Sequence, residues 1–215
     1  MCYNLSMSHT RLDQLSDGIF AIVMTLLVFE INIPEWFVPL SNSELWAELS
    51  GLAPRLISYV LSFALLFTYW RAHHFFISIY AKNVDVHLTN INALFFLLIA
   101  LIPSTSSLLS RFSQNELAIS IFGIHIILIG LALFWMRRYV LFSEHIQNPE
   151  ISKREIHGST VRTFIPIIFA LIAIPLSFLS TSFSIILFTL AVLFNLSPAS
   201  TKLFEKFFVP SSATP

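Results

Sequence analysis

The chain has 215 residues, of which 56% are hydrophobic and only 11% are charged. Soluble domains usually carry about 25% charged residues, so most of this surface must face something less polar than water, and the lipid bilayer is the natural candidate. The formal net charge is zero, which argues against binding to nucleic acid through bulk charge attraction. A single cysteine, Cys2, excludes an intrachain disulfide framework and a cysteine-based metal site.

Six apolar segments follow one another along the chain, and we predict a membrane-spanning helix for each. They cover residues 19–33, 56–79, 88–109, 117–140, 161–179 and 183–196. Because a helix needs about 20 residues to cross the hydrocarbon core, the first segment must continue backwards through Asp17 to about Arg11. The predicted fold class is an all-α membrane protein, with one six-helix transmembrane domain over residues 1–208 and a disordered tail over residues 209–215.

Lysine and arginine are distributed unevenly among the connections between these segments. If the N-terminus is cytoplasmic, ten of the 12 lie on the cytoplasmic side, and only Arg55 and Arg111 lie on the other. Cytoplasmic loops carry the excess of positive charge, so we predict a multi-pass protein of the cell membrane with both termini in the cytoplasm. The outer stretch 32–53, which carries Trp46, Glu44 and Glu48, is predicted to be amphipathic and to lie at the interface.

Polar residues interrupt the apolar segments at three places, which the topology brings to one membrane face. They are Ser16 and Asp17 on the first helix, Trp70, His73 and His74 on the second, and His87, Asn90 and Asn92 on the third. Arg11 and Asp17 are about 240° apart around a helix, so Asp17 needs a partner on another helix or solvent. One interpretation is a polar network that anchors the first helix. The other is an ordinary interfacial cluster in contact with headgroups and water.

Motifs for metal binding and catalysis are missing. The adjacent His73 and His74 point about 100° apart on a helix, so they do not chelate one ion from one face. The sequence has no H-x-x-x-H pair, no G-x-S-x-G, no H-E-x-x-H and no glycine-rich phosphate loop. We therefore predict that the protein is not an enzyme and has neither a metal site nor a cofactor.

The first helix carries an apolar stripe. Ile22, Leu26, Phe29 and Ile33 are spaced by four, three and four residues, and Thr25 lies beside them. Such a stripe is most often a seam between packed helices. It is a pore lining if several copies assemble around an axis, because one six-helix subunit of this size leaves little room for an aqueous cavity of its own.

At these positions the chain resembles a known family. Arg11, Ser16 and Asp17, within "RLDQLSD", resemble the R-x-x-x-F-S-D signature of the transmembrane protein 175 family of potassium channels. The second and third helices are similar to that family's W-x-x-H-H and N…P pattern, at Trp70, His73, His74, Asn92 and Pro103. The resemblance covers at least residues 11–110, and the number of spans extends it to the whole chain.

The resemblance implies a potassium-selective leak channel for monovalent cations, without the T-V-G-Y-G carbonyl filter. Members with one six-helix unit form homotetramers in the lipid membrane, and the first helix of each subunit lines the pore. By position, Ile22 is the principal hydrophobic constriction, Thr25 and Leu26 lie one turn further out, and Phe29 lies a turn beyond. Glu30 forms an acidic ring in the vestibule, and potassium is the permeant ion rather than a cofactor.

The resemblance also assigns the polar residues. Those implied to hold the pore helix are Arg11, Ser16, Asp17, Trp70, His73 or His74, and Asn92. Two positions depart from the family pattern: Leu15 replaces the usual phenylalanine of the signature, and Phe29 stands where leucine is more typical. We expect the first change to weaken one packing contact and the second to narrow the outer constriction.

Two other functions remain open at this stage. One is a secondary transporter, proton-coupled or for cations, that uses Asp17, His73 and His74 as a relay. Transporters of that kind usually show broken helices and repeated halves, whereas this sequence has no internal repeat and few intramembrane prolines. The other is a membrane scaffold that transports nothing. A fourfold assembly with the first helix on its axis distinguishes the channel from both.

Overall fold

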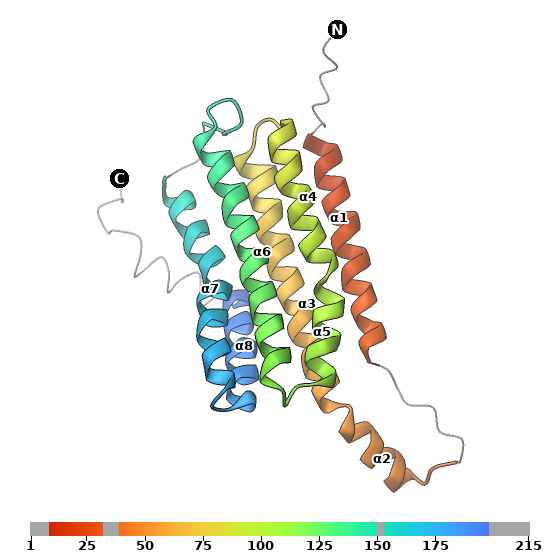
Figure 1. Ribbon diagram of the computed structural model, residues 1–215. Helices are drawn as coiled ribbons and strands as arrows, with labels where there is room; N and C mark the ends of the chain where they lie inside the picture. The colour runs from red at the N-terminus through yellow and green to blue at the C-terminus, as the bar shows by residue number, and fades with distance from the viewer. Residues whose placement is uncertain (1–8, 32–38, 150–152, 198–215) are drawn as a thin grey trace.

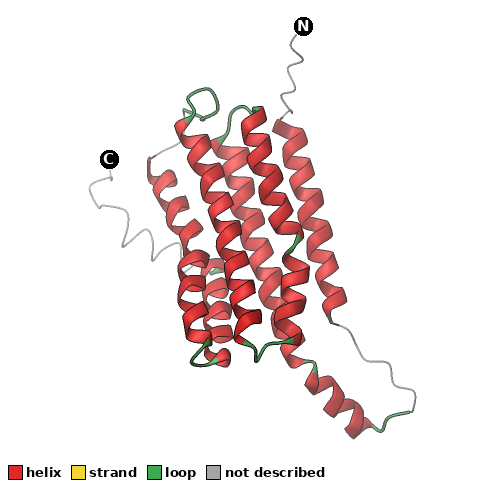
Figure 2. Ribbon diagram, viewed as in Figure 1, coloured by secondary structure: helices red, strands yellow, loops and turns green. Residues whose placement is uncertain are grey.

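The computed structural model describes residues 9–31, 39–149 and 153–197, which form an all-helical bundle (Figures 1 and 2). The predicted disordered tail lies outside these residues. The elements in chain order are α1 (His9–Leu26), the 3-10 helix η1 (Leu27–Glu30), α2 (Asn42–Gly51), α3 (Ala53–His74), the π-helix η2 (Phe75–Tyr80), α4 (Val86–Ala100), α5 (Ile102–Arg111), α6 (Glu116–Phe142), α7 (Lys153–Ser177) and α8 (Thr181–Leu196).

Several of these helices are long and apolar enough to cross a membrane. In the described part of the chain they are His9–Glu30, Val86–Arg111 and Glu116–Phe142, and a fourth arises if Asn42–Gly51 and Ala53–Tyr80, which meet at 44°, count as one span. Phe164–Ser177 and Thr181–Leu196 are apolar but shorter. The fold is therefore an all-helical, membrane-type bundle with several apolar helices, and the number of six spans stays a prediction.

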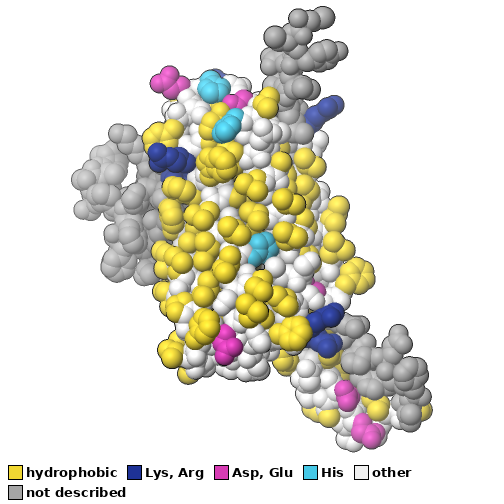
Figure 3. Space-filling model, in the orientation of Figure 1, with side chains coloured by type: hydrophobic (Ala, Val, Ile, Leu, Met, Phe, Trp, Pro, Cys, Tyr) yellow, Lys and Arg dark blue, Asp and Glu magenta, His cyan; other side chains and the backbone are white. Residues whose placement is uncertain are grey.

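The surface agrees with a membrane environment. In the view of Figure 3, hydrophobic side chains cover the middle of the bundle, and charged side chains gather towards its two ends. The first helix begins at His9, so it does extend back past Arg11, as the thickness of the bilayer requires. With η1 added, it reaches 22 residues.

The third predicted segment is broken into α4 and α5 at Leu101. Pro103 causes the break, because it has no N–H to donate to the carbonyl four residues earlier, and proline suits the first turn of the helix that follows. His125 of α6 lies against the break, with its Nε2 2.9 Å from the Leu98 carbonyl oxygen and its Nδ1 2.8 Å from Thr105 Oγ1. The carbonyl can only accept, so Nε2 donates to it and the Thr105 hydroxyl donates to Nδ1.

The start of α4 is fixed by Asp85. One of its carboxylate oxygens accepts from the Leu88 N–H at 2.7 Å, while the other accepts from the Tyr139 hydroxyl and lies 3.2 Å from His145 Nε2. Burial alone raises the pKa of Asp85, but these hydrogen bonds outweigh it and hold that pKa below its usual value. This cap therefore ties the α3–α4 connection to α6 and to the turn that follows α6.

Helix α1 packs against the bundle through one face only. Its buried residues are Leu12, Ser16, Phe20 and Val23, and Leu27 of η1 continues the line. The spacing of four, four, three and four residues is that of one helical stripe. On the other side of the molecule, α6 approaches α7 closely at Gly130, where a Cβ atom would come within 2.5 Å of Ile167 Cγ1.

Candidate functional site

One of the most deeply buried polar groups of the bundle is His73, on α3. Its side chain is fully buried and its ring stacks on Phe95, with centroids 5.2 Å apart and planes at 6°. Its Nδ1 lies 3.0 Å from Ser16 Oγ on α1, and its Nε2 lies 2.6 Å from Asn92 Oδ1 on α4. Three helices thus meet at one imidazole, and we call Ser16, His73 and Asn92 the buried anchor.

The donor and acceptor of each hydrogen bond in the buried anchor follow from the bond that Asn92 makes on its other side, to Leu88. The Asn92 Nδ2 group donates to the Leu88 carbonyl oxygen at 2.9 Å, so Oδ1 must be the acceptor that faces His73. Nε2 therefore carries the ring proton, and Nδ1 accepts from the Ser16 hydroxyl. The chain runs in one direction, from Ser16 through His73 and Asn92 to Leu88, and a neutral imidazole satisfies every position in it.

A second polar group lies beside the buried anchor and is more exposed. Trp70 Nε1 donates to Asp17 Oδ1 at 2.8 Å, and the Trp70 ring stacks on His74 with centroids 6.0 Å apart. His74 Nδ1 is 3.4 Å from Asp13 Oδ1, and Ser78 Oγ donates to Asp13 Oδ2 at 3.0 Å. Asp17 thus finds its partner on another helix, and His73 and His74 belong to separate groups.

Asp13 and Ser78 were missed by the sequence analysis. Asp13 precedes Asp17 by four residues, so both carboxylates lie on one face of α1, and this spacing was the signal that pointed to a shared surface. Ser78 lies in η2, where the wider turn of a π-helix changes which side chains face α1. Arg11 is exposed in the first turns of α1.

The face of α1 opposite the buried anchor is exposed to the surroundings of the subunit, and we call it the bare face of α1. Ile22, Leu26 and Phe29 are 61%, 44% and 77% exposed. Thr25 is exposed beside them, and its hydroxyl donates to the Ile22 carbonyl oxygen at 2.8 Å. Because the hydroxyl proton is used within the helix, the lone pairs of Thr25 Oγ1 stay available to a cation or to water.

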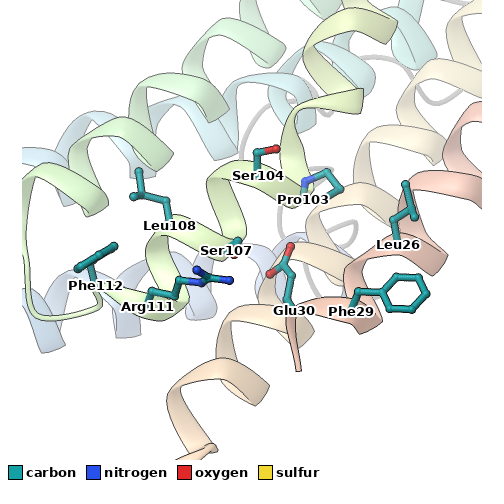
Figure 4. Close-up of a pocket in the computed structure, with 9 residues that line it drawn as sticks. All are labelled: Leu26, Phe29, Glu30, Pro103, Ser104, Ser107, Leu108, Arg111 and Phe112. Atoms are coloured by element: carbon teal, nitrogen blue, oxygen red, sulfur yellow. The ribbon is translucent and has the colours of Figure 1, made fainter. Parts of the chain in front are cut away.

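Glu30 is the last residue of η1, at the end of the first helical segment that lies farthest from the buried anchor. It borders an open pocket of about 630 Å³ between η1 and α5, and Figure 4 shows its carboxylate turned towards Ser107 and Arg111 of α5. Both carboxylate oxygens are buried, and among the described residues neither has a hydrogen-bond partner. The carboxylate thus faces α5 of its own subunit, and the acidic ring around an axis stays a prediction.

The described helices form no candidate metal centre, since no three His, Cys, Asp or Glu side chains come together. What they do form is an apolar helix, held by buried polar bonds on one face and bare on the other, in a bundle of membrane-length helices. This arrangement defines a multi-pass helical membrane protein.

Comparisons with known proteins are consistent with a multi-pass helical membrane protein and identify its family. The family model described as endosomal/lysosomal potassium channel TMEM175 matches residues 11–103. A protein of Chryseobacterium sp. (strain P1-3) named a potassium channel is 31% identical over 193 residues, which are 89% of this chain and 94% of that protein. The chain belongs to the TMEM175 family, as a prokaryotic member in the cell membrane, which confirms the predicted resemblance. It is a family of ion channels rather than of enzymes.

Two further relatives are informative, one for the fold and one for the ions that members of the family conduct. The crystal structure of a TMEM175 homologue from Chamaesiphon minutus, described as a lysosomal potassium-selective channel, superposes with a TM-score of 0.75 at 25% identity, covering 87% of this chain and 96% of that one. TMEM175 of Rattus norvegicus, named an endosomal/lysosomal proton channel, is 27% identical over 216 residues, which are 93% of this chain but 41% of that protein.

Proposed function

We propose that the chain is the subunit of a homotetrameric, potassium-permeable cation channel whose axis is lined by α1 and η1. The observation that supports this proposal is that α1 has one buried face and one exposed apolar face. One face is buried in the subunit at every turn from Leu12 to Leu27, and the other exposes Ile22, Leu26 and Phe29. Four such exposed faces around an axis would enclose a pore between the subunits.

In this assembly the chain crosses the membrane six times and both termini are cytoplasmic. The break at Leu101 then lies within a single span made of α4 and α5, and residues 1–208 form one channel domain. The excess of Lys and Arg on one side supports this orientation. It places the buried anchor towards the cytoplasmic end and the Glu30 pocket towards the outer end.

Permeation works by constriction and hydration rather than by carbonyl cages. A ring of four Ile22 side chains is the narrowest point and gates by dewetting, with Leu26 and Phe29 as further apolar rings. The Thr25 hydroxyl oxygens replace part of the hydration shell of a passing cation. Glu30, at the edge of the outer vestibule, raises the local cation concentration.

The test is ion flux through the purified protein in liposomes, with its oligomeric mass measured in the same preparation. We expect a tetramer and a potassium flux that rises when Ile22 is replaced by Asn, because a polar ring stays wet. A monomer, or a flux that does not respond to Ile22→Asn, contradicts a pore along α1.

A proton-coupled or cation transporter is the alternative, and the half-exposed Asp13–His74 pair beside Asp17 favours it. His73 does not suit a relay, since its single ring proton is committed to Asn92 and its ring is packed among phenylalanines. Reversal potentials at two pH values and two potassium gradients separate the possibilities. A reversal potential that follows the proton gradient alone, with no response to potassium, supports a proton pathway instead.

A further inference from the structure

Helix α2 is a complete helix that buries none of its residues against the described part of its own subunit. A capping box starts it, in which the Ser41 hydroxyl accepts from the Glu44 N–H and the Glu44 carboxylate accepts from the Ser41 N–H. No residue of α2 is buried. In Figure 1, α2 extends away from the foot of α3, on the same side of the bundle as α1.

The sequence of α2 nevertheless has an apolar face. Leu45, Trp46 and Leu49 lie within one turn of each other, and Trp46 is 73% exposed. Glu48 borders this face and is exposed. Glu44 is already held by the cap, so Glu48 is the acidic group that α2 presents. An apolar face with one acidic edge suits a partner surface that is apolar and basic.

A surface of that kind lies at the same end of the bundle. The pocket between η1 and α5 has an apolar rim that includes Phe29, Leu108 and Phe112, and the exposed guanidinium of Arg111 stands at its edge (Figure 4). None of the residues that line this pocket belongs to α2 of the same subunit. Glu30 also lines the pocket, but both of its carboxylate oxygens are buried. The charge exposed at the rim is therefore that of Arg111, and an apolar rim with an exposed cation complements α2 in both respects.

We propose that in the assembled channel α2 of one copy packs into the η1–α5 pocket of the neighbouring copy, with Trp46 in the cleft and Glu48 beside Arg111. This interface rests on the tetramer of the proposed function. A second copy is the occupant because both surfaces lie at one end of the bundle and α2 extends on the side of α1, which faces the assembly. The sequence analysis expected this stretch at the membrane interface, and the lipid surface is the occupant favoured if the cross-link described below does not form.

Cross-linking between two distinguishable copies tests the contact directly. Cys2 is replaced by Ser in both copies, one tag marks a chain with Trp46→Cys, and another marks a chain with Phe112→Cys. Both chains are produced in one cell, and their membranes are oxidised. We expect a disulfide-linked pair that carries both tags. Because each chain has one cysteine, a bond within a chain does not arise. The matched control replaces Phe112→Cys by Leu97→Cys, an exposed position on α4, and yields no mixed pair.

Charge reversal provides the second measurement. Glu48→Arg and Arg111→Glu should each lower the tetramer fraction in mild detergent several-fold, and the two together should restore it. A tetramer that conducts potassium but gives no Trp46–Phe112 cross-link and no rescue refutes this interface and leaves the channel standing. A monomer without potassium flux refutes the proposed function, and with it the interface.

Discussion

Replacing Ser16 by Ala should destabilise the protein while leaving the bare face of α1 unchanged. The Ser16 hydroxyl donates to His73 Nδ1 at 3.0 Å, and both side chains are buried. Alanine removes the donor and leaves a ring nitrogen without water or another partner to replace it. A buried polar atom left unsatisfied costs about 1–3 kcal/mol, and 1 kcal/mol shifts the melting temperature of a chain of this size by about 2–4 °C. The expected fall is therefore about 2–12 °C.

Thermal melting of the purified protein in one detergent measures this fall. Thr25→Val is the matched control, because it also deletes a hydroxyl from α1, but one that bonds within its own helix on the exposed face. Surface changes of that kind stay within about 0.5 kcal/mol, so its melting temperature should move by no more than about 2 °C. Equal melting temperatures for Ser16→Ala and Thr25→Val would show that the hydrogen bond to His73 does not hold α1.

A double-mutant cycle sharpens the result. Asn92→Ala removes the acceptor for His73 Nε2 at the other end of the same chain of hydrogen bonds. Residues that share a partner are energetically coupled, by about 0.5–3 kcal/mol. The loss in Ser16→Ala/Asn92→Ala should therefore differ from the sum of the two single losses. Strict additivity would mean that the two bonds act independently and that His73 does not link α1 to α4.

Four further outcomes are expected. Ile22→Asn should raise potassium flux in liposomes, because a polar ring hydrates the constriction, and unchanged flux contradicts this. Thr25→Val should lower the preference for potassium over sodium, read from reversal potentials under bi-ionic conditions, without blocking the pore. The lowered pKa of Asp85 stabilises the fold above about pH 4 and this contribution is lost as pH falls through the folded pKa, so Asp85→Asn should flatten the acid limb of a melting-temperature profile. Gly130→Ala should lower stability by about 1–3 kcal/mol, because its methyl group meets Ile167, and an unchanged melting temperature refutes that close approach.

The sequence predicted most of what lies within single helices. The need to span a bilayer required the first helix to reach back to about Arg11, and α1 begins at His9. Asp17 was expected to find a partner on another helix or to face solvent, and in the structure it is exposed and accepts from Trp70 on α3. These conclusions depend on lengths, angles along one helix and the cost of burying a polar group, which residue types alone determine.

Contacts between different helices were harder to predict from the sequence. Adjacent histidines are indistinguishable by type, and only the rotation of α3 against α1 and α4 shows that His73 is buried while His74 faces Asp13. Glu30 belongs to the same helix as the apolar stripe, yet η1 is a 3-10 helix. A 3-10 helix has 3.0 residues per turn and an α-helix has 3.6. The side chain of Glu30 therefore points in another direction than an α-helix continued from α1 would give it, and its carboxylate faces α5.

The rotation of α1 about its own axis is what connects the buried anchor to the proposed pore. Successive residues of a helix are about 100° apart, so a rotation of that size would replace Ile22 on the bare face by a neighbouring residue. The apolar contacts of α1 resist such a rotation less specifically, since hydrophobic burial has no direction of its own. The hydrogen bond from Ser16 to His73 has a fixed direction and exists at one rotation only. In the proposed tetramer, this buried hydrogen bond would thus determine which apolar side chains of α1 face the axis.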